Sequence, residues 1–139
     1  MGAEIHRLRE RISDSEKITI NLGYVDLGQV DLLVREGFYS NRTDMIRTAI
    51  RNQLRVHAED LKQTIVRETL EIGLRHYSRE DLERVRADGE MLSIKVIGLA
   101  IIAEDVPACL AFEAIKSITV LGALQASKAV KAALADRLR

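Results

Sequence analysis

Six residues near the N-terminus, "KITINL" at positions 17–22, alternate between hydrogen-bonding and apolar side chains. The polar members are Lys17, Thr19 and Asn21, and the apolar members are Ile18, Ile20 and Leu22. In a β-strand the two sets point to opposite sides. The alternation therefore predicts a strand with one apolar face that must be covered and one polar face that is open to solvent or to a ligand.

No group of residues in the sequence has the spacing of a catalytic site. The chain has no glycine-rich phosphate loop, no nucleophile elbow and no HExxH sequence. His6, His57 and His76 lie far apart, and a single cysteine, Cys109, excludes an internal disulfide and fits a reducing compartment. We therefore expect no enzyme, no metal site and no cofactor, and we interpret Cys109 as a small core residue.

A first helix should follow the strand directly. Asp26 and Gln29 have the spacing of a capping box, and apolar residues then recur at helical spacing. Gly37 stands where a glycine often ends a helix. The segment between the strand and Gly37 is thus expected to be helical, with Asp26 at its start.

A second helix is expected after a short polar turn. Asn41, with Asp44 three residues later, is a typical helix start, and the helix should run to about Glu59 or beyond. Its apolar stripe is Met45, Ile46, Ala49, Ile50 and Leu54. The opposite face carries Arg47, Arg51 and Arg55, which we interpret as a solvated face.

One strand followed by two helices cannot form a sheet by itself. Its backbone donors and acceptors would stay unpaired on both edges. The same strand of a second copy can pair with it in an antiparallel, two-fold arrangement. In that dimer Ile18, Ile20 and Leu22 of both copies would form a shared core under the helices.

This order of elements and the sequence "KITINL…REGFYSNRTDMIRTAIRNQL" resemble the ribbon-helix-helix family of DNA-binding regulators, the CopG/Arc/MetJ group. The resemblance covers residues 17–57. It implies that the paired strands lie in the major groove of DNA and that Lys17, Thr19 and Asn21 read the bases. Lysine can donate to guanine, asparagine can pair bidentately with adenine, and threonine can contact either base or the thymine methyl group.

The same resemblance implies a phosphate site at the start of the second helix, at Asn41 and Arg42, where unpaired N–H groups and the helix dipole favour an anion. A nickel-sensing relative joins a similar unit to an α/β domain with several histidines and a cysteine as ligands. Here only His57, His76 and Cys109 are available, and no pair has close ligand spacing. Metal sensing is therefore not expected.

The C-terminal half shows an internal repeat. Gly73, Gly98 and Gly122 fall 25 and 24 residues apart. Leu82, Val106 and Val130 recur every 24 residues, and Asp81, Asp105 and Ser127 lie near the expected helix starts. A period in the twenties is typical of short strand–helix solenoid repeats, although a small α/β domain with ordinary crossovers would also fit. Either arrangement predicts a folded module that associates with itself.

Together these features predict an α+β fold. Residues 1–16 would form an arm, 17–60 the ribbon-helix-helix unit, 61–68 a helical connector and 69–139 a small α/β oligomerisation module. Basic and acidic residues number 21 each, so any DNA affinity must come from a local surface rather than from net charge. No apolar stretch is long enough to span a membrane.

The expected function is sequence-specific regulation of transcription in the cytoplasm. The chain would bind double-stranded operator DNA as a dimer, act as a repressor, and multimerise through its C-terminal module. One alternative is the antitoxin of a toxin–antitoxin pair, which usually carries a short disordered tail. Another is a DNA-tethered assembly or scaffold protein.

Overall fold

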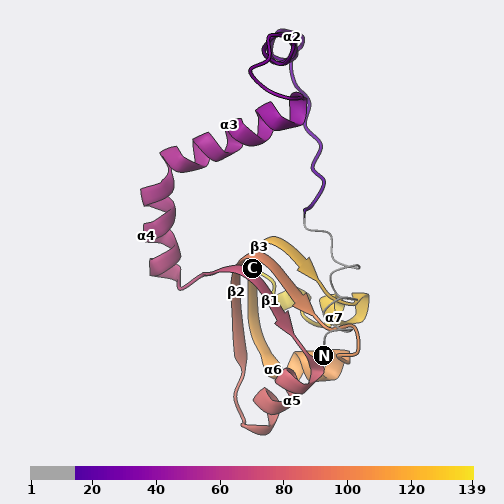
Figure 1. Cartoon of the computed structure of the whole chain (residues 1–139). Coiled ribbons are helices and arrows are strands. Elements are labelled where there is room, and N and C mark those ends of the chain that lie inside the picture. The colour runs from indigo at the N-terminus through magenta and orange to yellow at the C-terminus, as the bar shows by residue number, and fades with distance from the viewer. Residues whose placement is uncertain (1–14) are drawn as a thin grey trace, which may run out of the picture. The chain divides into compact units, whose positions relative to one another are not determined.

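The computed structural model describes residues 15–139, which form two compact units that divide between Asp60 and Leu61 (Figure 1). The described residues contain six α-helices, one 3-10 helix and a three-stranded parallel sheet. The first unit contains α2 (Tyr24–Arg35) and α3 (Arg42–Val56), and α4 (Ala58–Glu68) follows. Most of the predicted N-terminal arm lies outside the described residues.

The first predicted helix is present but begins earlier than expected. Gly23 precedes α2 in an extended conformation and provides no side-chain cap, so the predicted capping box of Asp26 and Gln29 is wrong. Asp26 lies instead in the first turn, where a negative charge suits the helix dipole. At the other end Gly37 has φ +84°, and its N–H donates to Val34 O at 3.1 Å. This left-handed residue ends the helix as predicted.

Helix α3 begins as predicted. The side chain of Asn41 accepts a hydrogen bond from the Asp44 N–H at 2.8 Å, and the Asp44 carboxylate accepts one from the Ser40 N–H at 3.0 Å. The predicted continuation to about Glu59 is interrupted, because the N–H of His57 bonds to Leu54 O, three residues back, and a new helix, α4, begins one residue later. A tightened last turn of this kind ends an α-helix.

The first unit has almost no core of its own. Among its described residues only Val30 is a buried apolar side chain. Residues 17–22 form no strand in the single chain, because a β-strand is defined by its hydrogen bonds to a neighbouring strand. The described apolar residues of this unit thus remain largely uncovered in one copy.

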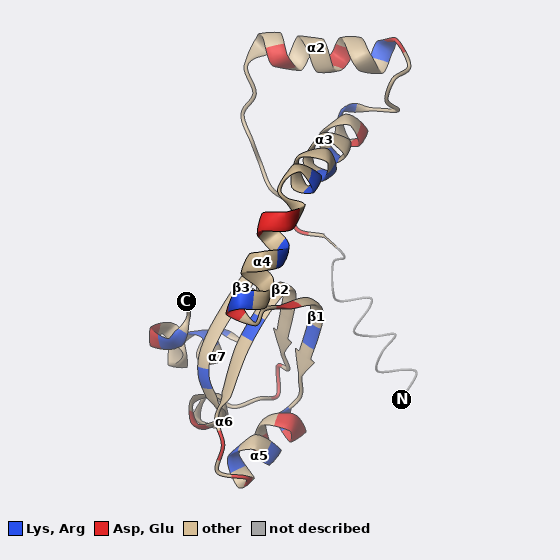
Figure 2. Ribbon diagram, turned by 90° about the vertical axis from the view of Figure 1, so that its left-hand side faces the viewer, with Lys and Arg blue, Asp and Glu red and all other residues tan. Residues whose placement is uncertain are grey.

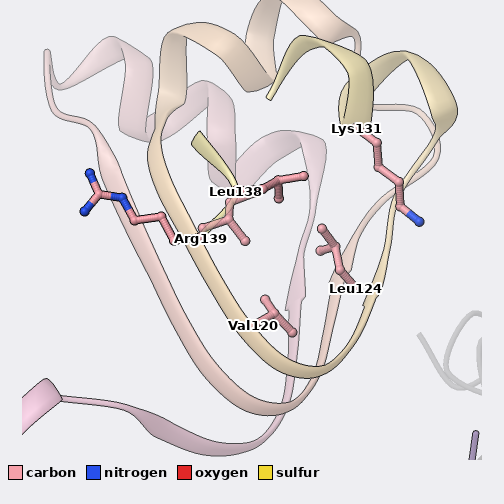
Figure 3. Close-up of a pocket in the computed structure, with 6 residues that line it drawn as sticks. Val120, Leu124, Lys131, Leu138 and Arg139 are labelled. Carbon is pink, nitrogen blue, oxygen red and sulfur yellow. The ribbon is translucent and has the colours of Figure 1, made fainter. Parts of the chain in front are cut away.

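The second unit consists of three strand–helix units. β1 (Glu71–Tyr77) is followed by α5 (Arg79–Ala87), β2 (Leu92–Ile102) by α6 (Ala108–Ala114), and β3 (Ile115–Gln125) by α7 (Lys128–Ala133). The strands are parallel and lie in the order β1-β2-β3. The strands are bent (Figure 3), α5 connects β1 to β2, and α6 connects β2 to β3.

The predicted repeat corresponds to the register of the sheet. Gly73 lies opposite Gly98, and Gly98 lies opposite Gly122, so the three glycines form one row across the strands. The thirteen-residue core contains the three equivalent apolar positions of the repeat, which are Leu82, Val106 and Val130. The 24-residue spacing of the sequence is thus the length of one strand–helix unit.

Asp81, Asp105 and Ser127 all lie near a helix start, as predicted. Ser78 and Asp81 form a reciprocal capping box on α5, and Ser127 caps α7 through the Val130 N–H at 3.2 Å. Asp105 lies in a turn two residues before Pro107, after which α6 begins. Proline has a fixed φ and no N–H to satisfy, which suits it to the first positions of a helix.

The C-terminal residues lie against β3. The 3-10 helix η1 (Ala135–Arg137) is followed by Leu138, which forms a parallel bridge with Ile118. The N–H of Arg139 donates to Ile118 O at 2.8 Å, and the guanidinium of Arg137 donates to Ile115 O at 2.6 Å. These contacts cover the first part of the outer edge of β3.

Candidate nucleic-acid interface

The six residues that alternate in the sequence lie in an extended, exposed segment. Lys17, Thr19 and Asn21 are all exposed, as their predicted role requires. The apolar members are exposed as well: Ile18 retains 74% of its accessible surface, Ile20 58% and Leu22 42%. In the single chain neither the polar nor the apolar set is buried against other residues. Three large apolar side chains in one short segment therefore face solvent.

The helices of the first unit carry further uncovered apolar side chains. Ile50 and Leu54, on the apolar stripe of α3, are about half exposed, and α3 contains no buried residue. Only Met45 and Ile46 on that stripe are partly buried. Both the extended segment and α3 thus present apolar surface that the chain itself does not cover.

Within the described residues, unpaired backbone N–H groups lie at the start of α3. Asn41 satisfies the N–H of Asp44, and the N–H of Met45 bonds to Asn41 O at 3.3 Å. The N–H groups of Arg42 and Thr43 have no hydrogen-bond partner among residues 15–139. Free N–H groups at the positive end of a 15-residue helix attract a phosphate oxygen.

The side chain of Arg42 has a partner that the sequence did not reveal. Its Nε and Nη2 atoms donate to the two carboxylate oxygens of Asp31, on α2, at 2.7 and 2.8 Å. These hydrogen bonds hold the pKa of Asp31 below its ordinary value and raise the pKa of Arg42. Eleven residues separate the pair in sequence, so no local pattern could have found it. The ion pair fixes the guanidinium beside the start of α3.

Basic side chains also follow α3. Arg47, Arg51 and Arg55 are exposed at a spacing of four residues, and Figure 2 shows basic positions recurring along the helix. Arg55 donates to the side chain of Asn52, at 3.4 Å. An exposed stripe of this kind is compatible with the solvated face that we predicted.

The histidines and the cysteine do not form a site within the described residues. No three histidine, cysteine or carboxylate side chains of residues 15–139 are close enough to hold a metal ion. His6 lies outside this part of the chain. Cys109 is exposed on α6, so its interpretation as a core residue is wrong; the neighbouring Leu110 and Ala111 face the core instead.

A model of the ribbon-helix-helix transcriptional regulator family matches residues 13–131. The chain therefore belongs to this family, whose members are regulators of transcription rather than enzymes. The match extends well beyond residues 17–57, to which the sequence resemblance was limited, and continues through the strands of the second unit as far as Lys131 in α7.

No curated protein and no solved structure matched the chain. No helix among the described residues is long and apolar enough to cross a membrane.

Proposed function

We propose that this chain is a sequence-specific DNA-binding repressor whose residues 17–22 pair with those of a second copy to form a ribbon in the major groove. The single observation that carries the proposal is the exposed, alternating segment at the start of a chain that belongs to a family of transcriptional regulators. An apolar set that the chain does not cover, beside a polar set of base-reading types, fits a paired ribbon on DNA.

Dimerisation would cover the apolar surface of the first unit. Ile18, Ile20 and Leu22 of the two copies would pack together beneath the exposed Ile50 and Leu54 of α3. Burying a side chain of this size contributes about 1.5–3 kcal/mol. The core of the dimer would therefore lie at the interface between the copies. The result would be a paired ribbon covered by two helices of each copy, which is what the name of the family describes.

The polar side chains would then divide into two roles. Lys17, Thr19 and Asn21 would contact base edges, which carry the sequence information. Asn41 and Arg42 would bind a phosphate at the start of α3, through the free N–H groups there. Asp31 uses only the Nε and Nη2 atoms of Arg42, so Nη1 remains able to donate to a phosphate oxygen.

The second unit would join such dimers into a larger assembly. Its three strand–helix units would behave as solenoid repeats, whose terminal units need a cap or a partner. Linked DNA-binding units raise the effective concentration of one another, which compensates for a chain without net positive charge. Repression in the cytoplasm would then be steric, because an occupied operator excludes the polymerase.

The test compares one base-reading variant with one phosphate-binding variant on DNA found by footprinting upstream of the chain's own gene. Asn21→Ala should weaken binding to that site by about 1–3 kcal/mol and barely change binding to a scrambled duplex. Arg42→Ala should weaken both alike and lower the salt dependence by about one unit. Arg47→Ala, on the exposed stripe, serves as the control. Equal losses from Asn21→Ala on both duplexes would remove the base-reading assignment.

The packed core of residues 61–139 also bears on the two alternatives. It argues against an antitoxin with a short disordered tail, because these residues fold around a core of their own. It is compatible with a DNA-tethered scaffold, which would form extended assemblies in electron micrographs even without DNA. A repressor of the kind proposed would require its operator for function.

A further inference from the structure

The row of glycines allows the strands to approach closely. Gly73, Gly98 and Gly122 have φ values of +128°, +134° and +121°, a region that other residues rarely adopt. A Cβ atom on Gly98 would lie 2.2 Å from the carbonyl oxygen of Gly73, and one on Gly122 would lie 2.1 Å from that of Gly98. Each of these two glycines therefore fits against the carbonyl group of the strand before it.

Gly73 has the same backbone conformation, but the corresponding place beside it is empty. Apart from Gly73 and its chain neighbours, no atom of residues 15–139 lies within 4 Å of the position that its Cβ would occupy. β1 is an edge strand, and all its residues except Tyr77 are exposed. Its outer edge can therefore accept a further parallel strand whose glycine carbonyl would face Gly73, as Gly73 faces Gly98.

The outer edge of β3 offers such a strand over a matching length. If Gly73 of one copy lay opposite Gly122 of another, the seven residues of β1 would lie along residues 120–126. The bridge between Leu138 and Ile118 lies just before that stretch. The C-terminal residues therefore cover the part of the edge that an incoming β1 does not need.

We propose that β1 of one copy pairs in parallel with β3 of a second copy, in the register that places Gly73 opposite Gly122. This interface deepens, and rests on, the multimerisation included in the proposed function. The contact joins two different edges of the second unit, so each copy keeps a free edge of each kind. Contacts of this head-to-tail type extend into rows or rings of copies.

The outer faces of the two strands match in this register. Ile72, 70% exposed, would lie beside Leu121, 55% exposed, and Leu74 would lie beside Ala123. Within the chain Ile72, Ile97 and Leu121 already form one apolar row across the sheet. The new pairing would continue this row from copy to copy and cover apolar side chains that one copy leaves in solvent.

The opposite faces match as well. A pocket of about 310 Å³ at the β3 end is lined by Ile118, Val120, Leu124, Lys131, Leu138 and Arg139. Val120, Leu124 and Leu138 lie between the arms of the bent strands (Figure 3). In the proposed register Glu71 would lie beside Val120, at a pocket that also contains the cationic Arg139. Arg75 would lie beside Leu124. Within one chain the Nε atom of Arg75 is 2.5 Å from the Glu71 carboxylate. Glu71, which already pairs with Arg75 of its own chain, would bring a carboxylate to a pocket that contains the basic residues Lys131 and Arg139.

Disulfide trapping in the full-length protein tests the register. In a Cys109→Ser background, Ile72→Cys and Leu121→Cys replace two exposed side chains. Neighbouring strands lie about 4.8 Å apart, so these cysteines could bond between copies. Within one chain β2 separates them, at about twice that distance, which is too far for a disulfide. Ile72→Cys with Gln125→Cys, four residues out of register, is the matched control.

Oxidation of the Ile72→Cys/Leu121→Cys protein should give a ladder of covalent oligomers that reductant removes. A mixture of the two single variants should give only a dimer. Neither single variant alone, nor the Gln125 control, should cross-link. A dimer from Ile72→Cys alone would mean that β1 pairs antiparallel with β1, and a double variant that stays monomeric on the gel would equally overturn the proposal.

The ladder does not depend on DNA, so the two proposals can fail separately. A ladder from a protein that binds no specific DNA would leave this interface standing and remove the proposed function. Specific DNA binding by a protein that forms no ladder would remove this interface and leave the proposed DNA-binding function standing.

Discussion

The two units of this chain have similar apolar patterns but differ in how far one copy buries them. The second unit buries Leu82, Val106 and Val130 in a core of thirteen residues within one chain. The described part of the first unit buries one apolar residue, Val30, and leaves Ile18 and Ile20 exposed. Apolar periodicity thus indicates which face of an element must be covered, but not whether the same chain or another copy covers it.

The largest effect should come from a charge in the interface of the first unit. Ile20→Asp would place an unpaired carboxylate in the shared core, so dimerisation and all DNA binding should be lost. Because the second unit has its own core, amide hydrogen exchange should rise in α2 and α3 and stay slow in β2.

Thr19→Asp is the matched control, since it places the same charge on the polar face of the same segment. It should weaken DNA binding by repelling phosphates but leave α2 and α3 protected. Loss of protection in both variants alike would show that the alternation does not separate a core face from a DNA face.

The next effect concerns the core of the second unit. Leu82 is fully buried, and Leu82→Ala should lower the free energy of unfolding of this unit by about 2–5 kcal/mol. Slow amide exchange in β2 measures that free energy. Met91→Ala, at a residue that is nearly half exposed, should change it by less than about 0.5 kcal/mol. Equal changes would contradict the placement of Leu82 in the core of the second unit.

The glycine row should respond unequally to an added methyl group. Within a single copy, Gly98→Ala and Gly122→Ala would clash with a neighbouring carbonyl group, whereas Gly73→Ala meets only the cost of its backbone conformation, roughly 1–3 kcal/mol. Thermal unfolding at a concentration too low for copies to associate should therefore rank Gly73→Ala as the mildest of the three. Gly28→Ala, in α2 with open space around it, should be neutral or stabilising. Equal losses at all three sites under those conditions would mean that the bend alone, and not close approach, requires glycine.

Local signals in the sequence predicted much of this arrangement. Asn41, Gly37 and Ser127 act at helix ends through neighbours within a few residues, and the repeat predicted from the glycine spacing corresponds to the register that the sheet adopts. These features depend on backbone geometry that a residue type largely determines by itself.

Other predictions failed where several local solutions compete. An aspartate can cap a helix or lie in its first turn. Because Gly23 is the residue before α2, Asp26 lies in the first turn. Cys109 lies on a seven-residue helix too short to define one apolar face by periodicity. The pairing of Asp31 with Arg42 joins two helices, and only the tertiary structure brings these side chains together. The sequence could not specify that contact.

The smallest effect concerns the two helix caps, one in each unit. In α5 the N–H and hydroxyl groups of Ser78 hold the pKa of Asp81 below its ordinary value. A lowered pKa in the folded state means that the unfolded state binds more protons near that pKa, so this contribution is present above about pH 4 and is lost as the pH falls further. The side chain of Asp81 is nearly half exposed, so screening by solvent keeps the contribution small.

Asp81→Asn should therefore destabilise the second unit slightly at pH 7, and the difference from the unchanged protein should shrink on acidification to about pH 3. Exchange in β2 measures it, because α5 packs on a core within the same chain. The equivalent change in the first unit, Asn41→Ala, should cost about 1 kcal/mol of helix stability. Because that unit lacks a core of its own, the loss should appear as weaker dimerisation and DNA binding, with exchange in β2 unchanged. Faster exchange in β2 after Asn41→Ala would mean that the two units do not fold independently.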